Sequence, residues 1–100
     1  MPFKKKHRCC KKVDGERFYK PIGKKIHALE KVIVNLDELE AMRLCDGLNL
    51  SQKEASEKME ISTGTLQRLV YSARKKMIDA IYNEQAIELQ IPENIIFNEN

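Results

Sequence analysis

The 100-residue sequence contains no tryptophan, and only six of its residues are aromatic. A chain of this length suffices for one small domain, whose core is expected to be mostly aliphatic. No stretch approaches the roughly 20 consecutive apolar residues that a membrane-spanning helix requires. The charged N-terminus is followed by no apolar segment of the kind found in secretory signals. The sequence therefore predicts a cytoplasmic protein that has no membrane partner.

Cysteines are few, and motifs for catalysis or cofactor binding are missing. The three cysteines are an odd number and Cys9 and Cys10 are adjacent, which is unlike a disulfide framework or a zinc site. The sequence has no glycine-rich phosphate loop and no nucleophile elbow. Asp37, Glu38 and Glu40 cluster at the start of a predicted helix, where carboxylates favour the helix dipole. We therefore expect no enzyme activity, no metal and no cofactor.

The charge is divided unevenly between the two ends of the chain. Residues 1–31 carry a net charge of +8, whereas residues 32–100 carry −5. Such asymmetry is typical of a protein that meets a polyanion with one part of its surface. The basic segment is expected to contact DNA phosphates or to lie in a minor groove. The residues proposed for these contacts are Lys4, Lys5, Lys6 and Arg8.

Apolar spacing and capping residues predict a mainly α fold with three helices and short strands. The helices are expected at 36–46, 52–59 and 63–82, and their N-terminal caps are Asn35, Ser51 and Ser62. Short strands are expected near 31–35 and 86–91. These strands are predicted to pair, either within one chain or between two.

Prolines and glycines, together with the composition, divide the chain into three parts. Residues 1–28 form a basic N-terminal arm that contains two prolines and two glycines and predicts little regular structure. Residues 29–91 form the helical domain, and residues 92–100 form a C-terminal tail that no pattern places.

The third helix is strongly two-sided. One apolar stripe is formed by Leu66, Leu69, Val70, Ala73, Met77, Ala80 and Ile81. The start and the opposite side supply the proposed DNA contacts, which are Ser62, Thr63, Gly64, Gln67, Arg68, Tyr71, Arg74 and Lys75.

These side chains match what the major groove of DNA offers. Arg68 can donate two hydrogen bonds to guanine, and Gln67 can bridge the polar groups of adenine. A tight turn separates this helix from the short helix before it, a pattern typical of a helix-turn-helix. The sequence thus predicts sequence-specific binding of double-stranded DNA by a transcriptional regulator. A homodimer would suit this function, because two half-sites raise affinity and specificity.

The order and spacing of several motifs resemble the UPF0251 family, also called DUF134. The motifs are LDELEAMRL at 36–44, LSQKEA at 50–55, IS at 61–62, TLQR at 65–68 and ARKK at 73–76. The family consists of small bacterial and archaeal proteins predicted to bind DNA. The resemblance covers residues 1 to about 91. It implies a helix-turn-helix similar to region 4 of sigma factors, in which the helix starting at Thr63 is the recognition helix.

The sequence departs from the family pattern at two positions. Glu60 stands where the family usually has glycine, at a turn that often requires positive φ. Ser56 stands where the family tends to have alanine, and it is still small enough for close helix packing.

Other functions remain open at this point. The fold could serve as a sigma-like protein-interaction module, as a nonspecific nucleic-acid binder, or as the output domain of a metal or redox sensor. The scarcity of aromatic residues argues against binding of single-stranded RNA.

Overall fold

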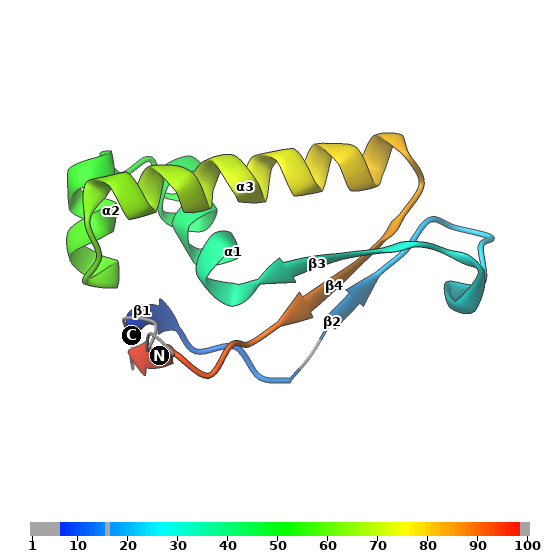
Figure 1. Ribbon diagram of the computed structural model, residues 1–100, viewed down its shortest axis with the longest axis horizontal. Helices are drawn as coiled ribbons and strands as arrows, with labels where there is room; N and C mark the ends of the chain where they lie inside the picture. Colours follow the sequence, from blue (N-terminus) through cyan, green and yellow to red (C-terminus); the bar gives the residue numbers. More distant parts are fainter. Residues whose placement is uncertain (1–6, 16, 99–100) are drawn as a thin grey trace, which may run out of the picture.

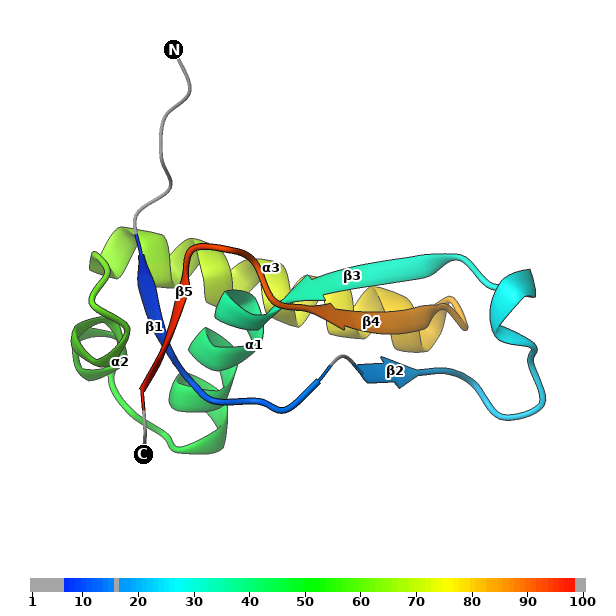
Figure 2. The ribbon, with the colours of Figure 1, turned by 90° about the horizontal axis from the view of Figure 1, so that it is seen from below.

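The computed structural model describes residues 7–15 and 17–98, which form three helices and five strands (Figure 1). A three-stranded sheet has the order β2–β4–β3, built from Arg17–Tyr19, Ala86–Gln90 and Lys31–Asn35. A second pair consists of β1 (Arg8–Lys11) and β5 (Ile95–Asn98). Figure 1 shows this pair below the helical end of the molecule, and Figure 2 shows it apart from the larger sheet.

The pairing of β3 with β4 confirms the expected strands and places both in one chain. The two run in parallel, with Lys31 opposite Ala86 and Asn35 opposite Gln90. Parallel neighbours need a long crossover connection, and all three helices lie within it. The β-branched sequence of β3, Lys-Val-Ile-Val-Asn, favours an extended strand at this position.

The helices lie close to the bounds that the sequence predicts. They are α1 (Leu36–Met42), α2 (Gln52–Met59) and α3 (Thr63–Tyr82). The first continues into a π-helical turn, η2 (Arg43–Gly47), and a short 3-10 helix, η1 (Ile26–Ala28), precedes β3. Capping boxes at Asn35 and Ser51 and a side-chain cap at Ser62 explain where the three helices begin.

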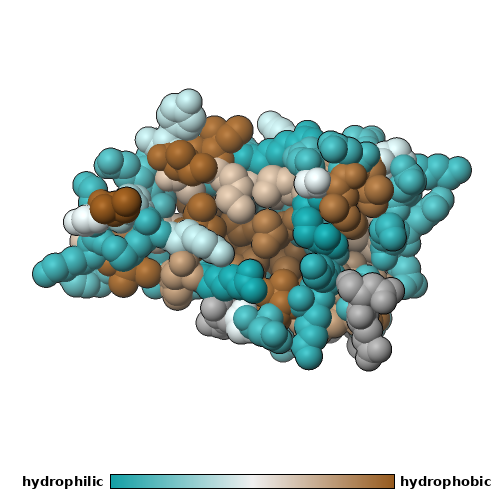
Figure 3. Space-filling view, turned by 180° about the vertical axis from the view of Figure 1, so that it is seen from behind, coloured by the Kyte–Doolittle hydropathy of each residue, from teal (hydrophilic) through white to brown (hydrophobic). Residues whose placement is uncertain are grey.

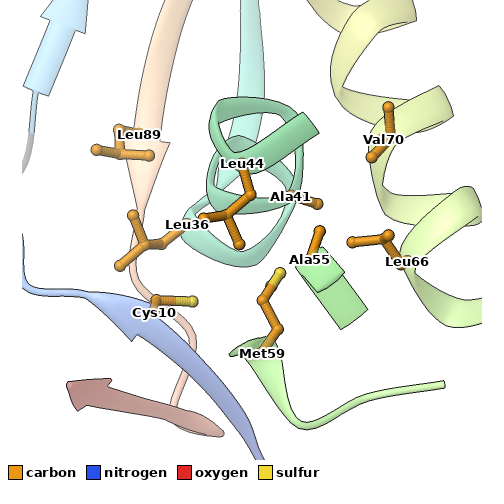
Figure 4. Close-up of a cluster of buried hydrophobic side chains, with 9 residues drawn as sticks. All are labelled: Cys10, Leu36, Ala41, Leu44, Ala55, Met59, Leu66, Val70 and Leu89. Atoms are coloured by element: carbon orange, nitrogen blue, oxygen red, sulfur yellow. The ribbon is translucent and has the colours of Figure 1, made fainter. Parts of the chain in front are cut away.

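The hydrophobic core lies where α1, α2 and the N-terminal half of α3 meet (Figure 4). Its members come from both sheets as well as from the helices: Cys10, Leu36, Ala41, Leu44, Ala55, Met59, Leu66, Val70 and Leu89. As expected, the core is mostly aliphatic. The C-terminal half of α3 extends beyond this cluster and lies over the three-stranded sheet (Figures 1 and 2).

The expectation of a mainly α fold is wrong, because the fold is mixed α/β with five strands in two sheets. Two of the missed strands, β1 and β2, lie in the basic N-terminal segment, and β5 lies in the C-terminal tail. Each has only three or four residues, too few for a clear alternating pattern. Their pairings also join distant parts of the chain, such as Cys10 with Phe97. These strands therefore form because of tertiary contacts, which cannot be recognised in the local sequence.

One member of the apolar stripe predicted on the third helix is misplaced. Ile81 keeps 70% of its surface exposed, whereas Leu66, Val70, Ala73 and Ala80 are buried. Ile81 projects from the flank of α3, beside the core stripe rather than within it.

Candidate nucleic-acid interface

The turn between α2 and α3 consists of three residues and sets the angle between the two helices. Glu60 ends α2 in the left-handed conformation, with φ 57° and ψ 45°. The positive φ expected at this position is therefore present, although the residue is not glycine. Ile61 follows and packs against the core, while Ser56 is buried on α2. The small Ser56 and the apolar Ile61 thus determine how closely α2 packs against α3.

The first turn of α3 exposes a compact group of polar side chains. The Ser62 hydroxyl accepts a hydrogen bond from the Thr65 amide at 3.1 Å and thereby caps the helix. Arg68 lies back over this turn, and its Nη2 donates to Thr65 Oγ1 at 3.2 Å. A Cβ atom at Gly64 would lie 3.7 Å from Nη1 of Arg68. The arginine is therefore exposed and held near the helix start by a neutral hydroxyl group.

A hollow of about 510 Å³ runs along the exposed side of α3. Its lining is Gly64, Gln67, Arg68, Tyr71, Ser72 and Lys75. Five of these six residues are among the DNA contacts proposed from the sequence, and the structure thus brings them onto one surface. We call this surface, together with Ser62 and Thr63, the α3 polar face.

Gln67 is joined to a residue that the sequence reasoning missed. Its Nε2 donates to Gln52 Oε1 at 2.7 Å, which links the start of α2 to the α3 polar face. Gln52 directly follows the Ser51 cap, and this position at the start of the shorter helix is the signal that could have identified it.

Two of the proposed basic contacts are engaged in ion pairs. Arg74 forms two hydrogen bonds with Asp46 of η2, at 2.6 and 2.9 Å, and lies outside the α3 hollow. Lys75 is 2.8 Å from Asp79, one turn further along α3. Both pairs are exposed to solvent, so their net stabilisation is small. Either cation can therefore exchange its carboxylate partner for a phosphate at little cost.

The four N-terminal residues that the sequence proposes as DNA contacts fall into two groups. Arg8 is the first residue of β1, and its Nε lies 3.3 Å from a carboxylate oxygen of Asp37. Only 18% of the Arg8 side chain is exposed, so this residue packs against the start of α1 and faces solvent little. Lys4, Lys5 and Lys6 lie outside the described residues.

Three carboxylates at the start of α1 are buried, with Asp37, Glu38 and Glu40 each keeping between 4% and 7% of their surface exposed. Their cationic partners come from three different elements: Arg8 for Asp37, Lys76 for Glu38 and Arg43 for Glu40. The helix dipole explains only part of their placement, because the ion pairs also join β1, α3 and η2 to the start of α1.

Glu38 fixes the position of α3. It accepts hydrogen bonds from the Ser72 hydroxyl, from Lys76 Nζ at 2.7 Å and from the Asn35 amide at 2.9 Å. Burial raises the pKa of Glu38, but these hydrogen bonds outweigh burial and hold its pKa below the ordinary value. The carboxylate thus remains charged and attached to the helix that carries the polar face.

The cysteines on β1 are poorly suited to bind metal or to react. Cys9 donates to Glu60 Oε2 at 2.7 Å, and this hydrogen bond, with burial and the charge of Glu60, raises the pKa of Cys9 to about 11. Burial, together with the charges of Glu40 and Asp37, raises the pKa of Cys10 to about 12. The thiolate is the form that binds metals and reacts. Within residues 7–15 and 17–98, no group of three or more histidine, cysteine and acidic residues could hold a metal ion.

None of the helices that the structure describes combines the length and apolar character needed to cross a bilayer.

Comparison with known proteins identifies the family. The model for "Protein of unknown function DUF134" matches residues 1–96. A UPF0251 protein of Caldanaerobacter subterraneus subsp. tengcongensis is 38% identical over 90 residues, which cover 90% of this chain and 76% of that protein. A UPF0251 protein of Dehalococcoides mccartyi is 39% identical, with 90% and 77% covered. No solved structure matches. The chain therefore belongs to the DUF134 family, among whose curated relatives are the UPF0251 proteins.

Proposed function

We propose that the protein binds double-stranded DNA in a sequence-specific manner, as a transcriptional regulator, with α2 and α3 acting as a helix-turn-helix. The observation that supports this most is the α3 polar face. Its exposed donors and acceptors lie on the first turns of a 20-residue helix that projects from a tight turn. A single α-helix fits the major groove and presents its N-terminal residues to base edges.

Each part of the α3 polar face has a role in the proposed complex. Arg68 and Gln67 read bases, and their present partners, Thr65 and Gln52, are neutral groups that are easily exchanged. Gly64 and Thr63 allow the helix end to approach the DNA closely. Tyr71 and Lys75 lie further along α3, where they contact the phosphate backbone, as does Arg74 beside the polar face.

In this proposal α2 and α3 form a helix-turn-helix similar to region 4 of sigma factors, and α3 is the recognition helix. Lys4, Lys5 and Lys6 add phosphate contacts that carry no sequence information.

Selection from a random duplex pool, followed by fluorescence anisotropy on the enriched sequence, tests the proposal. Arg68→Ala is expected to weaken binding by about 1–3 kcal/mol and to relax specificity at one position of the motif. Arg17→Ala is the matched control, because Arg17 is also exposed but lies on β2, at a distance from α3.

Four results would contradict the proposal. Binding without an enriched motif would indicate a nonspecific nucleic-acid binder. Equal effects of the Arg68 and Arg17 variants would show that only net charge matters. No binding to duplex DNA would favour a protein-interaction module, and stronger competition by RNA would favour RNA as the ligand.

A further inference from the structure

The side chains of Gln52 and Gln67 join the two helices of the proposed helix-turn-helix. Nε2 of Gln67 donates a hydrogen bond to Oε1 of Gln52 at 2.7 Å, between residues that lie 15 positions apart in the sequence. Both residues are exposed, and Gln67 also lines the hollow along α3. Figure 3 shows mostly hydrophilic side chains over the end of the molecule that α2 forms. The pair therefore lies on a polar surface that is open to a ligand.

The position of Gln52 is fixed by the start of α2. Gln52 is the first residue of this helix and directly follows the Ser51 cap. The Glu54 amide donates to Ser51 Oγ and the Ser51 amide donates to Glu54 Oε1, each at 3.1 Å. Further along α2, Ala55 and Met59 are buried in the core. Gln52 is thus carried by a well-anchored part of α2.

The hydrogen bond between the two side chains determines which groups Gln67 can offer to a base. A glutamine amide has two N–H donors and one oxygen acceptor, and its terminal torsion turns easily, so that either group can face a ligand. In the present contact, Gln52 accepts one N–H of Gln67. The second N–H and the oxygen of Gln67 are not used in this contact. Gln67 therefore does not have to release Gln52 in order to form two hydrogen bonds with a base.

We propose that Gln52 is a positioning residue that makes Gln67 selective for adenine, an inference that rests on the proposed function. Adenine presents one acceptor and one donor to the major groove, N7 and N6, whereas guanine presents two acceptors, N7 and O6. An amide that turns freely can direct both of its N–H groups to guanine. Because Gln52 holds one N–H, the groups that remain on Gln67 are one donor and one acceptor, which match adenine.

Arg68 provides an internal reference for this role of Gln52. Its Nη2 donates to Thr65 on its own helix, so the position of the guanidinium does not depend on the Gln52 side chain. A change at Gln52 should therefore alter the base preference at the position that Gln67 reads and leave the position that Arg68 reads unchanged. A merely structural effect, such as a displaced α2, would alter the preferences at both positions.

Affinities of the full chain for selected duplexes that differ at a single base pair test the inference. The base pair is the one at which Gln67→Ala abolishes the preference found by selection. The wild type is expected to prefer adenine to guanine there by about tenfold or more, and Gln52→Ala to lower this preference by about fivefold or more. Gln85→Ala is the matched control, because Gln85 also donates a side-chain hydrogen bond, to Glu30, but lies beyond the end of α3.

Two further variants test the direction of the hydrogen bond. Gln52→Glu keeps an acceptor for the Gln67 N–H and is expected to retain most of the adenine preference. Gln52→Lys can only donate, so it would bind the Gln67 oxygen, leave both N–H groups for guanine and reverse the preference. Each preference is a ratio of two affinities of one variant, so the effect of the altered net charge, which acts on every duplex alike, cancels.

NMR of the free protein tests the contact between the two side chains without DNA. The side-chain NH₂ signals of Gln67 are expected to shift in Gln52→Ala and to stay unchanged in Gln85→Ala. Thermal unfolding followed by circular dichroism checks that all variants fold.

The outcomes separate this inference from the proposed function. Unchanged NH₂ signals of Gln67 in Gln52→Ala, an adenine preference that survives this substitution, or an equal loss at the position that Arg68 reads would overturn the inference alone. A motif without an adenine that depends on Gln67 would also overturn it and leave sequence-specific binding standing. Selection that enriches no motif would overturn the proposed function, and this inference with it.

Discussion

At the scale of single residues, Glu60 stores backbone strain at the turn before α3. Its φ of 57° lies in the left-handed region, which is unfavourable for a residue that has a Cβ atom. Glu60→Gly is therefore expected to be more stable than Glu60→Ala by about 1 kcal/mol.

Urea unfolding of the two Glu60 variants measures this difference. The comparison is internally controlled, because both variants lack the carboxylate that accepts the Cys9 hydrogen bond. Equal stabilities, or a more stable alanine variant, would show that the turn is not strained.

Glu38 links the stability of the fold to pH. Because its folded-state pKa lies below the ordinary value of 4.5, its contribution is complete above that value and is lost as pH falls through the folded pKa. Glu38→Gln is expected to lower the free energy of unfolding at pH 7 by about 2 kcal/mol or more, because Lys76 loses a buried partner.

Urea unfolding at pH 7 and at several lower values tests the role of Glu38. The wild type should lose stability more steeply below pH 4.5 than Glu38→Gln. Glu57→Gln is the control, since Glu57 is exposed on α2 and lies outside the Ser51 capping box. Parallel pH curves for the wild type and Glu38→Gln would contradict the assignment.

At the scale of secondary structure, the helices and the strands β3 and β4 were predictable, whereas the shorter strands β1, β2 and β5 were not. Ser51 with Glu54, and Ser62 ahead of a long apolar stripe, are local signals that define α2 and α3. The strand β1 has no such signal. Its sequence Arg-Cys-Cys-Lys becomes a strand because Cys10 is buried in the core and the strand pairs with β5.

The same division applies to the candidate site. Residues that share the exposed side of α3, such as Gln67 and Arg68, follow from helical spacing and lie together in the structure. Partners from other elements do not follow from spacing. The Gln52 contact, the Asp46 ion pair of Arg74 and the burial of Arg8 all depend on tertiary packing.

The basic N-terminal segment therefore has two parts with different expected roles. Deleting residues 1–6 removes Lys4, Lys5 and Lys6 but leaves β1 intact. The slope of log binding constant against log salt is expected to decrease by about 0.9 for each DNA phosphate that these lysines no longer neutralise. Anisotropy over a range of salt concentrations measures this slope.

The enriched sequence motif should not change on this deletion, because phosphate contacts carry no base information. An unchanged slope would exclude the N-terminal lysines from the interface.

At the scale of the whole molecule, the fold places two surfaces at opposite ends of one helix. The polar face occupies the start of α3, where α1, α2 and the buried Glu38 hold it in position. The last turns of α3 lie over the three-stranded sheet and expose Ile78, Ile81 and Tyr82. The three-stranded sheet, which a mainly α description leaves out, thus supports the end of α3 that extends beyond the core.

The specificity ratio tests the central claim most directly. It is the affinity for the selected duplex divided by the affinity for a scrambled duplex of equal length and composition, at one physiological salt concentration. Sequence-specific binding predicts a ratio of about 10³ or more for the wild type, and a ratio at least about tenfold lower for Arg68→Ala. A wild-type ratio near one would contradict sequence-specific DNA recognition by the α3 polar face.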